Sequence, residues 1–210
     1  MENTGFRPSR FGLDNHGLGK VARAHWNLGA PGLFEHALRR QEGRLTAHGA
    51  FIALTGEHTG RSPNDRFVVD EPSIHDEIWW GDVNKPIGPV QFDGLHNKVL
   101  DHLNAAGEVF VQNCYAGAHP GNRLKVRIIT ENAWHSLFAR NMFITPPDDE
   151  LDGFEPDFTV LQAPSVLADP ATHGTATSTF ILVNLAKKMI IVGGSRYAGE
   201  IKKSIFSIMN

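Results

Sequence analysis

The stretch that most constrains the fold is the last one, residues 189–210. A short apolar run, Met189-Ile-Ile-Val192, is broken by two glycines, and a pattern with helical spacing follows. Short apolar runs bounded by glycine are typical of buried strands, and apolar residues three and four positions apart are typical of amphipathic helices. The stretch therefore predicts a strand, a glycine turn and a helix in succession.

Two lysines, Lys202 and Lys203, stand at the start of this predicted helix. At about 100° per residue, Lys202 falls inside a broad apolar arc, and Lys203 lies at the edge of the arc. The arc is made by Ile201, Ile205, Phe206, Ile208 and Met209. We expect Lys202 to be partly desolvated there, which disfavours its charged form. The alternative is that both lysines extend from a packed helix to water.

Strands and helices interleave at uneven spacing along the rest of the chain. Helices are predicted at residues 33–41 and 91–106, and a third follows Thr130 as its cap. Strands are predicted at residues 50–54, 66–69, 109–112, 124–129, 159–162, 179–184 and 189–192. Because some of the joins have hairpin length, we predict an α/β (α+β-like) fold in which helices flank a mixed β-sheet.

The domain organisation is simple. Residues 1–32 contain six glycines and few apolar runs, which predicts an irregular N-terminal tail. At 210 residues, the chain is long enough for one large domain or two small ones. In residues 113–123 the length and the glycines predict an exposed loop, and the aromatic pair Trp79-Trp80 is expected to pack a loop against the core.

Composition excludes several classes of function. The net charge is -3 and the basic residues are scattered, which argues against nucleic-acid and membrane-surface partners. No apolar run approaches the ~18 residues of a membrane span, and residues 1–8 lack the apolar core of a signal peptide, so a cytoplasmic protein is expected. The single cysteine, Cys114, cannot form an internal disulfide, and the 11 histidines show no metal-ligand spacing.

A second informative stretch is Thr55-Gly-Glu-His-Thr-Gly-Arg-Ser-Pro63. Its glycines let the backbone approach a ligand, and Arg61 offers a planar fork of donors suited to a carboxylate or a phosphate. It is not a phosphate loop of the Walker type, because three residues separate its glycines and arginine replaces lysine. The stretch predicts an anion-binding loop or, equally, a simple turn before the strand at residues 66–69.

Common catalytic motifs are absent: there is no His-Glu-x-x-His, no Gly-x-Ser-x-Gly and no dinucleotide-binding fingerprint. What remains is a cationic set, Arg61 with Lys202 and Lys203, accompanied by Tyr197. Preplaced donors of this kind suit an anionic substrate whose charge grows in the transition state.

Six motifs, in order along residues 33–210, resemble the N-terminal, substrate-binding domain of ATP-dependent phosphoenolpyruvate carboxykinases. They are Thr55-Gly-x-x-Thr-Gly-Arg-Ser-Pro63, Trp80-Gly-Asp-Val-Asn-Lys-Pro86, Val109-Phe-Val-Gln112, Ala133-Trp-His-Ser-Leu-Phe-Ala-Arg-Asn-Met-Phe143, Pro156-Asp-Phe-Thr159 and Tyr197-Ala-Gly-Glu-Ile-Lys-Lys203. The resemblance implies that domain's fold and the conversion of oxaloacetate and ATP to phosphoenolpyruvate, CO2 and ADP.

The resemblance also implies roles for four residues. Arg61 would grip the substrate carboxylate and the departing CO2, and Tyr197 would line the pocket for oxaloacetate and phosphoenolpyruvate. Lys203 would ligate Mn2+ and contact the nucleotide, and Lys202 would hold the transferring phosphoryl group. Mg2+ would accompany ATP.

The family's metal-binding histidine and aspartate, its phosphate loop and a further substrate arginine fall beyond the point that matches Asn210. We therefore expect a partial chain without turnover of its own, whose packing partner is the C-terminal nucleotide-binding domain. The alternative is a natural product of 210 residues, either a non-catalytic dicarboxylate-binding module or a decayed remnant of the enzyme. A packing domain without a ligand is a more remote alternative.

Overall fold

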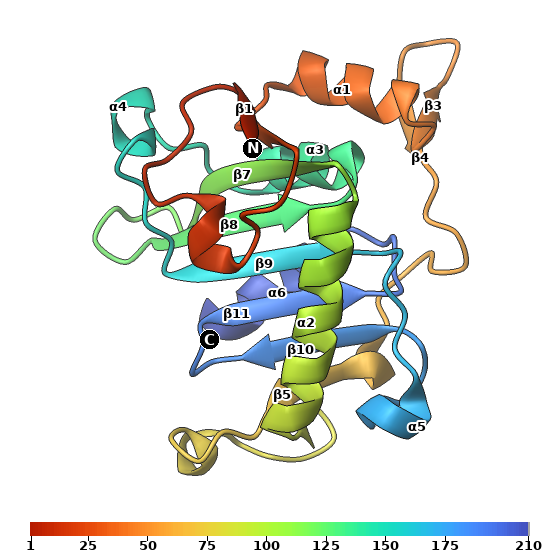
Figure 1. The fold of residues 1–210 in the computed structure, drawn as a ribbon, viewed down its shortest axis with the longest axis vertical. Helices are drawn as coiled ribbons and strands as arrows, with labels where there is room; N and C mark the ends of the chain where they lie inside the picture. The colour runs from red at the N-terminus through yellow and green to blue at the C-terminus, as the bar shows by residue number, and fades with distance from the viewer. Residues whose placement is uncertain (210) are drawn as a thin grey trace.

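A nine-stranded mixed β-sheet forms the centre of the computed structural model, which describes residues 1–209 (Figure 1). In spatial order its strands are β1 (Glu2–Gly5), β2 (Arg23–Trp26), β7 (Glu108–Ala116), β8 (Leu124–Thr130), β9 (Phe158–Ala163), β11 (Met189–Gly193), β10 (Phe180–Asn184), β5 (Arg66–Val69) and β6 (Lys85–Ile87). The pairs β7–β8 and β10–β11 are antiparallel, and the other neighbours are parallel. The predicted mixed sheet is confirmed.

Helices cover both faces of this sheet (Figure 1). They are α1 (Ala30–Arg39), α2 (Pro89–Ala105), α3 (Ala133–Met142), α4 (Asp148–Leu151), α5 (Pro170–His173) and α6 (Gly199–Met209). Short 3-10 turns lie at Leu13–His16, Pro63–Asp65 and His75–Glu77, and a small antiparallel hairpin is made by β3 (Gly43–Leu45) and β4 (Phe51–Ala53). No helix among residues 1–209 is long and apolar enough to cross a membrane.

The longest helix, α2, crosses one face of the sheet (Figure 1). Pro89 stands in its first turn, where the missing N–H would have had no partner inside the helix. Phe92, Leu95, Val99 and Leu103 recur every three or four residues and are fully buried, as their spacing predicts. This stripe packs α2 against the sheet and fixes that face of the core.

The opposite face of the sheet is covered by α6 and α3. Successive residues of a strand point to opposite faces, so in β11 Ile191 joins the core under α2, and Ile190 and Val192 join the core under α6. From α6, Ile201 and Ile205 insert into that second core and are at most 1% exposed. Burial of each such side chain contributes about 1.5–3 kcal/mol, which is enough to hold α6 in place.

The first 32 residues correct the prediction of an irregular tail. β1 pairs with β2, and β2 pairs with β7, so the segment forms one edge of the sheet. Leu13 and Leu18 are fully buried in the main core. The buried guanidinium of Arg127 donates hydrogen bonds to the carbonyl oxygens of Phe11 (2.5 Å) and Phe154 (3.0 Å). The sequence pattern misses this because the strands are only four residues long, and a distant arginine holds the segment between them.

Two smaller predictions are wrong. The exposed loop predicted to begin at residue 113 begins later, because residues 113–116 continue β7 and are buried. Trp79 does not pack against the core: it is 85% exposed, and only its neighbour Trp80 is half-buried. The indole N–H of Trp80 donates to the carbonyl oxygen of His75 at 2.9 Å, which holds that ring within its own loop.

Candidate active site

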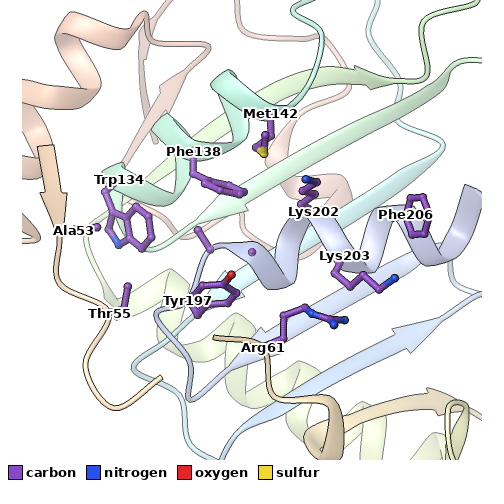
Figure 2. Close-up of a pocket in the computed structure, with 12 residues that line it drawn as sticks. Ala53, Thr55, Arg61, Trp134, Phe138, Met142, Tyr197, Lys202, Lys203 and Phe206 are labelled. Atoms are coloured by element: carbon purple, nitrogen blue, oxygen red, sulfur yellow. The ribbon is translucent and has the colours of Figure 1, made fainter. Parts of the chain in front are cut away.

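A cavity of about 690 Å³ opens between α3 and α6 and is bordered by the loop that carries Arg61 (Figure 2). Its lining residues come from segments that are far apart in the sequence. They are Ala53, Thr55, Arg61, Trp134, Phe138, Met142, Tyr197, Ala198, Gly199, Lys202, Lys203 and Phe206. The four predicted site residues, Arg61, Tyr197, Lys202 and Lys203, are therefore brought together at one cavity.

The glycine turn between β11 and α6 has steric causes. A Cβ on Gly193 would lie 2.2 Å from Cζ of Phe180, and Gly194 has a φ of +72°, in the left-handed region that favours glycine. The chain then reaches Tyr197, whose backbone N–H donates to Oγ of Ser195 at 3.2 Å. A Cβ on Gly199 would lie 2.4 Å from the Tyr197 ring, so that glycine leaves room for the ring beside the first turn of α6.

The two lysines lie on the cavity side of α6, and the placement of Lys202 corrects the expectation of an apolar arc. Lys202 and Phe206 are exposed, and Lys203 is half-buried. The expected arc is split, because Ile201 and Ile205 face the sheet and Phe206 faces the cavity. The ammonium of Lys203 lies 4.5 Å from the centroid of the Phe206 ring, a favourable cation–π distance.

The Arg61 loop is tied to α6 by a buried carboxylate, Glu200. Its Oε1 accepts a hydrogen bond of 2.7 Å from the backbone N–H of Ser62, the residue after Arg61. Glu200 is 3% exposed, and burial raises the pKa of its carboxyl group, although the Ser62 hydrogen bond and the charge of Arg61 oppose this shift. The loop that presents Arg61 is thus fixed to the helix that presents the lysines.

His58 fastens the same loop on its other side. Its Nδ1 lies 3.1 Å from Oγ of Ser62, and its Nε2 lies 2.9 Å from Oγ1 of Thr179, next to β10. Arg61 itself is exposed at the cavity. The stretch around Arg61 is therefore more than a turn before β5, since it is anchored at two points and leaves its guanidinium facing the opening.

The apolar wall of the cavity comes from α3, through Trp134, Phe138 and Met142 (Figure 2). Thr130 does not cap this helix as predicted, because Asn132 occupies the N-cap position. The capping side chain is that of Glu42, which is distant in sequence. Its carboxylate accepts from the backbone N–H groups of Ala133 (3.1 Å) and Trp134 (2.8 Å), and a negative charge is favourable at a helix N-terminus.

Behind the wall, His135 is fully buried, and its Nε2 lies 2.9 Å from the carbonyl oxygen of Arg196. Burial lowers the pKa of His135 to about 4, so the ring is neutral at pH 7 and donates this hydrogen bond. The contact joins α3 to the residue directly before Tyr197, and therefore links the apolar wall to the segment that positions the tyrosine.

The cavity suits an anionic ligand. Three cationic side chains and a phenol face an apolar wall, and among residues 1–209 the lining includes no carboxylate and no imidazole. For the same reason the lining alone does not fit Mn2+, which favours carboxylate, carbonyl and water ligands. A metal held by Lys203 would need its other ligands from outside this lining.

The sequence singles out the charged residues that line this cavity, but it does not reveal the residues that position them. Local sequence signals mark these charged residues: a glycine-rich loop contains Arg61, and a helical apolar pattern after two glycines contains Lys202 and Lys203. Glu42 and Glu200 resemble ordinary surface carboxylates in the sequence, and only the fold shows that they are buried and bound to backbone N–H groups.

Comparisons with known proteins show which family this chain resembles. The family model described as phosphoenolpyruvate carboxykinase matches residues 22–210. A phosphoenolpyruvate carboxykinase (ATP) of Geobacter metallireducens is 49% identical over 199 residues, which are 95% of this chain and 37% of the relative. Relatives of the same name from Brevibacillus brevis (50% over 190 residues; 90% and 36%) and Methylobacterium nodulans (46% over 210 residues; 100% and 39%) are similar. The chain thus spans less than two fifths of the length of these relatives.

Proposed function

Because the chain belongs to the ATP-dependent phosphoenolpyruvate carboxykinase family, we propose that it supplies the substrate-binding half of such an enzyme. The enzyme would convert oxaloacetate and ATP to phosphoenolpyruvate, CO2 and ADP, a step of gluconeogenesis. The observation that carries the proposal is the convergence of Arg61, Tyr197, Lys202 and Lys203 on one cavity. The cationic lining supports an anionic substrate of carboxylate and phosphate character.

In this proposal the cations contact different parts of the substrates. The Arg61 guanidinium binds a carboxylate of oxaloacetate with two parallel donors and holds the CO2 that departs from it. Tyr197 borders the substrate and orients it. Lys202 donates to the phosphoryl group during its transfer. Lys203, the next residue of α6, lines the same cavity from another side of the helix.

The chemistry that these residues support proceeds in two steps. Cleavage of the carbon–carbon bond to the departing carboxylate leaves its electron pair on the remaining fragment as an enolate, with CO2 as the other product. The enolate oxygen then attacks the γ-phosphorus of ATP, and ADP leaves. Negative charge builds on the enolate and on the phosphoryl oxygens, and cations preplaced in a dry cleft stabilise that charge.

We propose that Lys203 provides one ligand to Mn2+ and one contact to the nucleotide, and that Mg2+ accompanies ATP. Ligation requires the lysine as a neutral amine. A bound divalent ion would act as a Lewis acid toward the enolate oxygen. The remaining ligands and the phosphate-binding loop would come from a nucleotide-binding domain that packs across the cavity. We expect the protein to act on small-molecule substrates and to be located in the cytoplasm.

The alternative, a dicarboxylate-binding module without catalysis, is favoured by one observation: the cavity lining among residues 1–209 offers anion-binding groups but no carboxylate ligand for a metal. Reading the coding DNA past codon 210 separates the two. A continuing frame with a phosphate loop supports the enzyme, and a stop codon supports the module.

The experiment that tests the proposal is a coupled assay for phosphoenolpyruvate with oxaloacetate, ATP and Mn2+. The full product of a continuing frame should turn over and lose most of its activity in Arg61→Ala, whereas the 210-residue chain alone should bind substrate without turnover. A full product that folds and forms no phosphoenolpyruvate would contradict the proposed reaction. Clear turnover by the 210 residues would contradict the prediction that they are inactive alone.

A further inference from the structure

Three potential metal ligands meet on the side of the molecule where α1 covers β2 and β7. They are His25 from β2, His36 from α1 and Glu108 at the start of β7, and their ligand atoms all lie within 4.8 Å of one another. None of the three lines the cavity that holds Arg61. Because they belong to different elements, no spacing in the sequence reveals them.

His25 is held firmly in one orientation. It is 5% exposed, and its ring stacks on that of Phe110 with centroids 4.8 Å apart and an interplanar angle of 16°. Its Nδ1 lies 2.7 Å from Oγ1 of Thr4, and its Nε2 lies 2.8 Å from Oε2 of Glu108. Histidines that bind metals through one nitrogen commonly donate from the other, and Thr4 is placed to accept that proton.

His36 closes the group on the side of α1. Its ring centroid lies 4.3 Å from that of His25 and 5.2 Å from that of Phe110. The side chain is half-buried, and the exposed Arg39 donates to its Nδ1 at 2.9 Å. An ion could therefore enter past His36, and loss of the Arg39 contact at the surface would cost little.

Glu108 is positioned by an arginine. Arg40 donates through one of its terminal nitrogens to Oε1 of Glu108, which leaves Oε2 directed toward His25. The charge of Arg40 is also shared with Glu42, whose Oε1 lies 2.6 Å from its Nε. Around the group there are three carboxylates, those of Glu35, Glu42 and Glu108, and two guanidiniums, those of Arg39 and Arg40. The excess of one negative charge keeps the region favourable for a cation.

We propose that His25, His36 and Glu108 form a zinc site separate from the active-site cavity. Two imidazoles and one carboxylate are a donor set that Zn2+ accepts, with ligand distances of about 2.0–2.2 Å, and a water would complete a tetrahedron. In the metal-free site, His25 and Glu108 are joined by a hydrogen bond, which the bound ion would replace. Bound Zn2+ would fasten α1 to β2 and β7.

The test is equilibrium titration of the purified chain with Zn2+, and with Co2+ as a spectroscopic substitute. One equivalent should bind, Co2+ should give the visible bands of a tetrahedral site, and the melting temperature should rise with Zn2+ concentration. His36→Gln and Glu108→Gln, at partly exposed positions, should each weaken binding at least tenfold while circular dichroism shows a folded chain. His48→Gln, at an exposed position in the turn between β3 and β4, is the matched control and should bind as the original chain does.

Equal binding by the original chain and by folded His36→Gln and Glu108→Gln would overturn the proposal. Weak binding of several equivalents, reduced as much by His48→Gln as by His36→Gln, would also overturn it, since that result marks surface histidines in general. Neither outcome depends on substrate binding or turnover, so the zinc proposal and the proposed enzymatic function can fail separately.

Discussion

Two buried histidines, His16 and His135, should make the fold sensitive to mild acid. The pKa of each is lowered to about 4: burial is the main cause in both, and Arg127 adds to it at His16. In the unfolded chain each histidine binds a proton near the ordinary pKa of about 6.5. In the folded chain each binds a proton only when the pH approaches its lowered pKa of about 4. The folded chain therefore holds this stability above the unfolded pKa and loses it as the pH falls toward 4.

The magnitude follows from linkage. Between pH 7 and pH 5, a histidine whose pKa falls from about 6.5 to about 4 on folding loses about 2 kcal/mol of unfolding free energy, and the two together lose about 4 kcal/mol. His36 and His96, whose pKa values are also lowered chiefly by burial, act in the same direction. His75, whose pKa is raised by its hydrogen bond with Asp70, opposes them from the surface.

Urea unfolding of the original chain and of His135→Gln at both pH values isolates one contribution. Glutamine can keep a donor toward the Arg196 carbonyl but does not titrate, so the variant should lose about 2 kcal/mol less than the original chain between pH 7 and pH 5. His48→Gln, a change at an exposed position, should leave the pH dependence unchanged. An identical pH dependence in the original chain and His135→Gln would refute the reasoning.

Three substitutions test buried contacts, one beneath the N-terminal segment and two beside the cavity. Arg127→Met should lower the free energy of unfolding by about 2–4 kcal/mol in urea titrations, because it leaves buried oxygen acceptors without a donor; a loss within error of zero would contradict this. Glu42→Ala should cost about 1–2 kcal/mol through loss of the α3 cap and should shift the fluorescence of Trp134; an unchanged spectrum and stability would disprove the cap. Gly199→Ala should displace the Tyr197 ring and weaken phosphoenolpyruvate binding roughly tenfold. The free energy of unfolding should change by less than about 1 kcal/mol. An unaltered affinity for phosphoenolpyruvate would show that the ring has room to move.

The sequence predicted the elements whose patterns are long and local. The helix over residues 91–106 lies at α2 because its apolar spacing matches the buried stripe. The strand at residues 66–69 coincides with β5, where a short continuous apolar run is buried. The glycine turn before α6 was predictable for the same reason: two glycines between a buried run and a helical pattern leave few other conformations.

The missed parts depend on contacts between distant residues. β1 and β2 are too short to show alternation, and they are placed by pairing with β7 and by the buried Arg127. The orientation of α6 was wrong at Lys202 because an apolar arc alone does not say which side meets the sheet and which meets a cavity. Glu200, which fixes the Arg61 loop, and the meeting of His25 and His36 leave no local signal at all.

The central claim is that the cavity between α3 and α6 binds phosphoenolpyruvate and that Arg61 holds its carboxylate. The most direct test is the dissociation constant of phosphoenolpyruvate, measured by calorimetric titration of the purified chain. The original sequence is compared with Arg61→Ala and with the control Arg44→Ala. Arg44 is exposed on β3 and does not line the cavity. Loss of a charged hydrogen-bonded contact should weaken binding by roughly ten- to a hundredfold in Arg61→Ala, and the control should bind unchanged. Equal affinities for all three proteins, or no binding by the original chain, would contradict the claim.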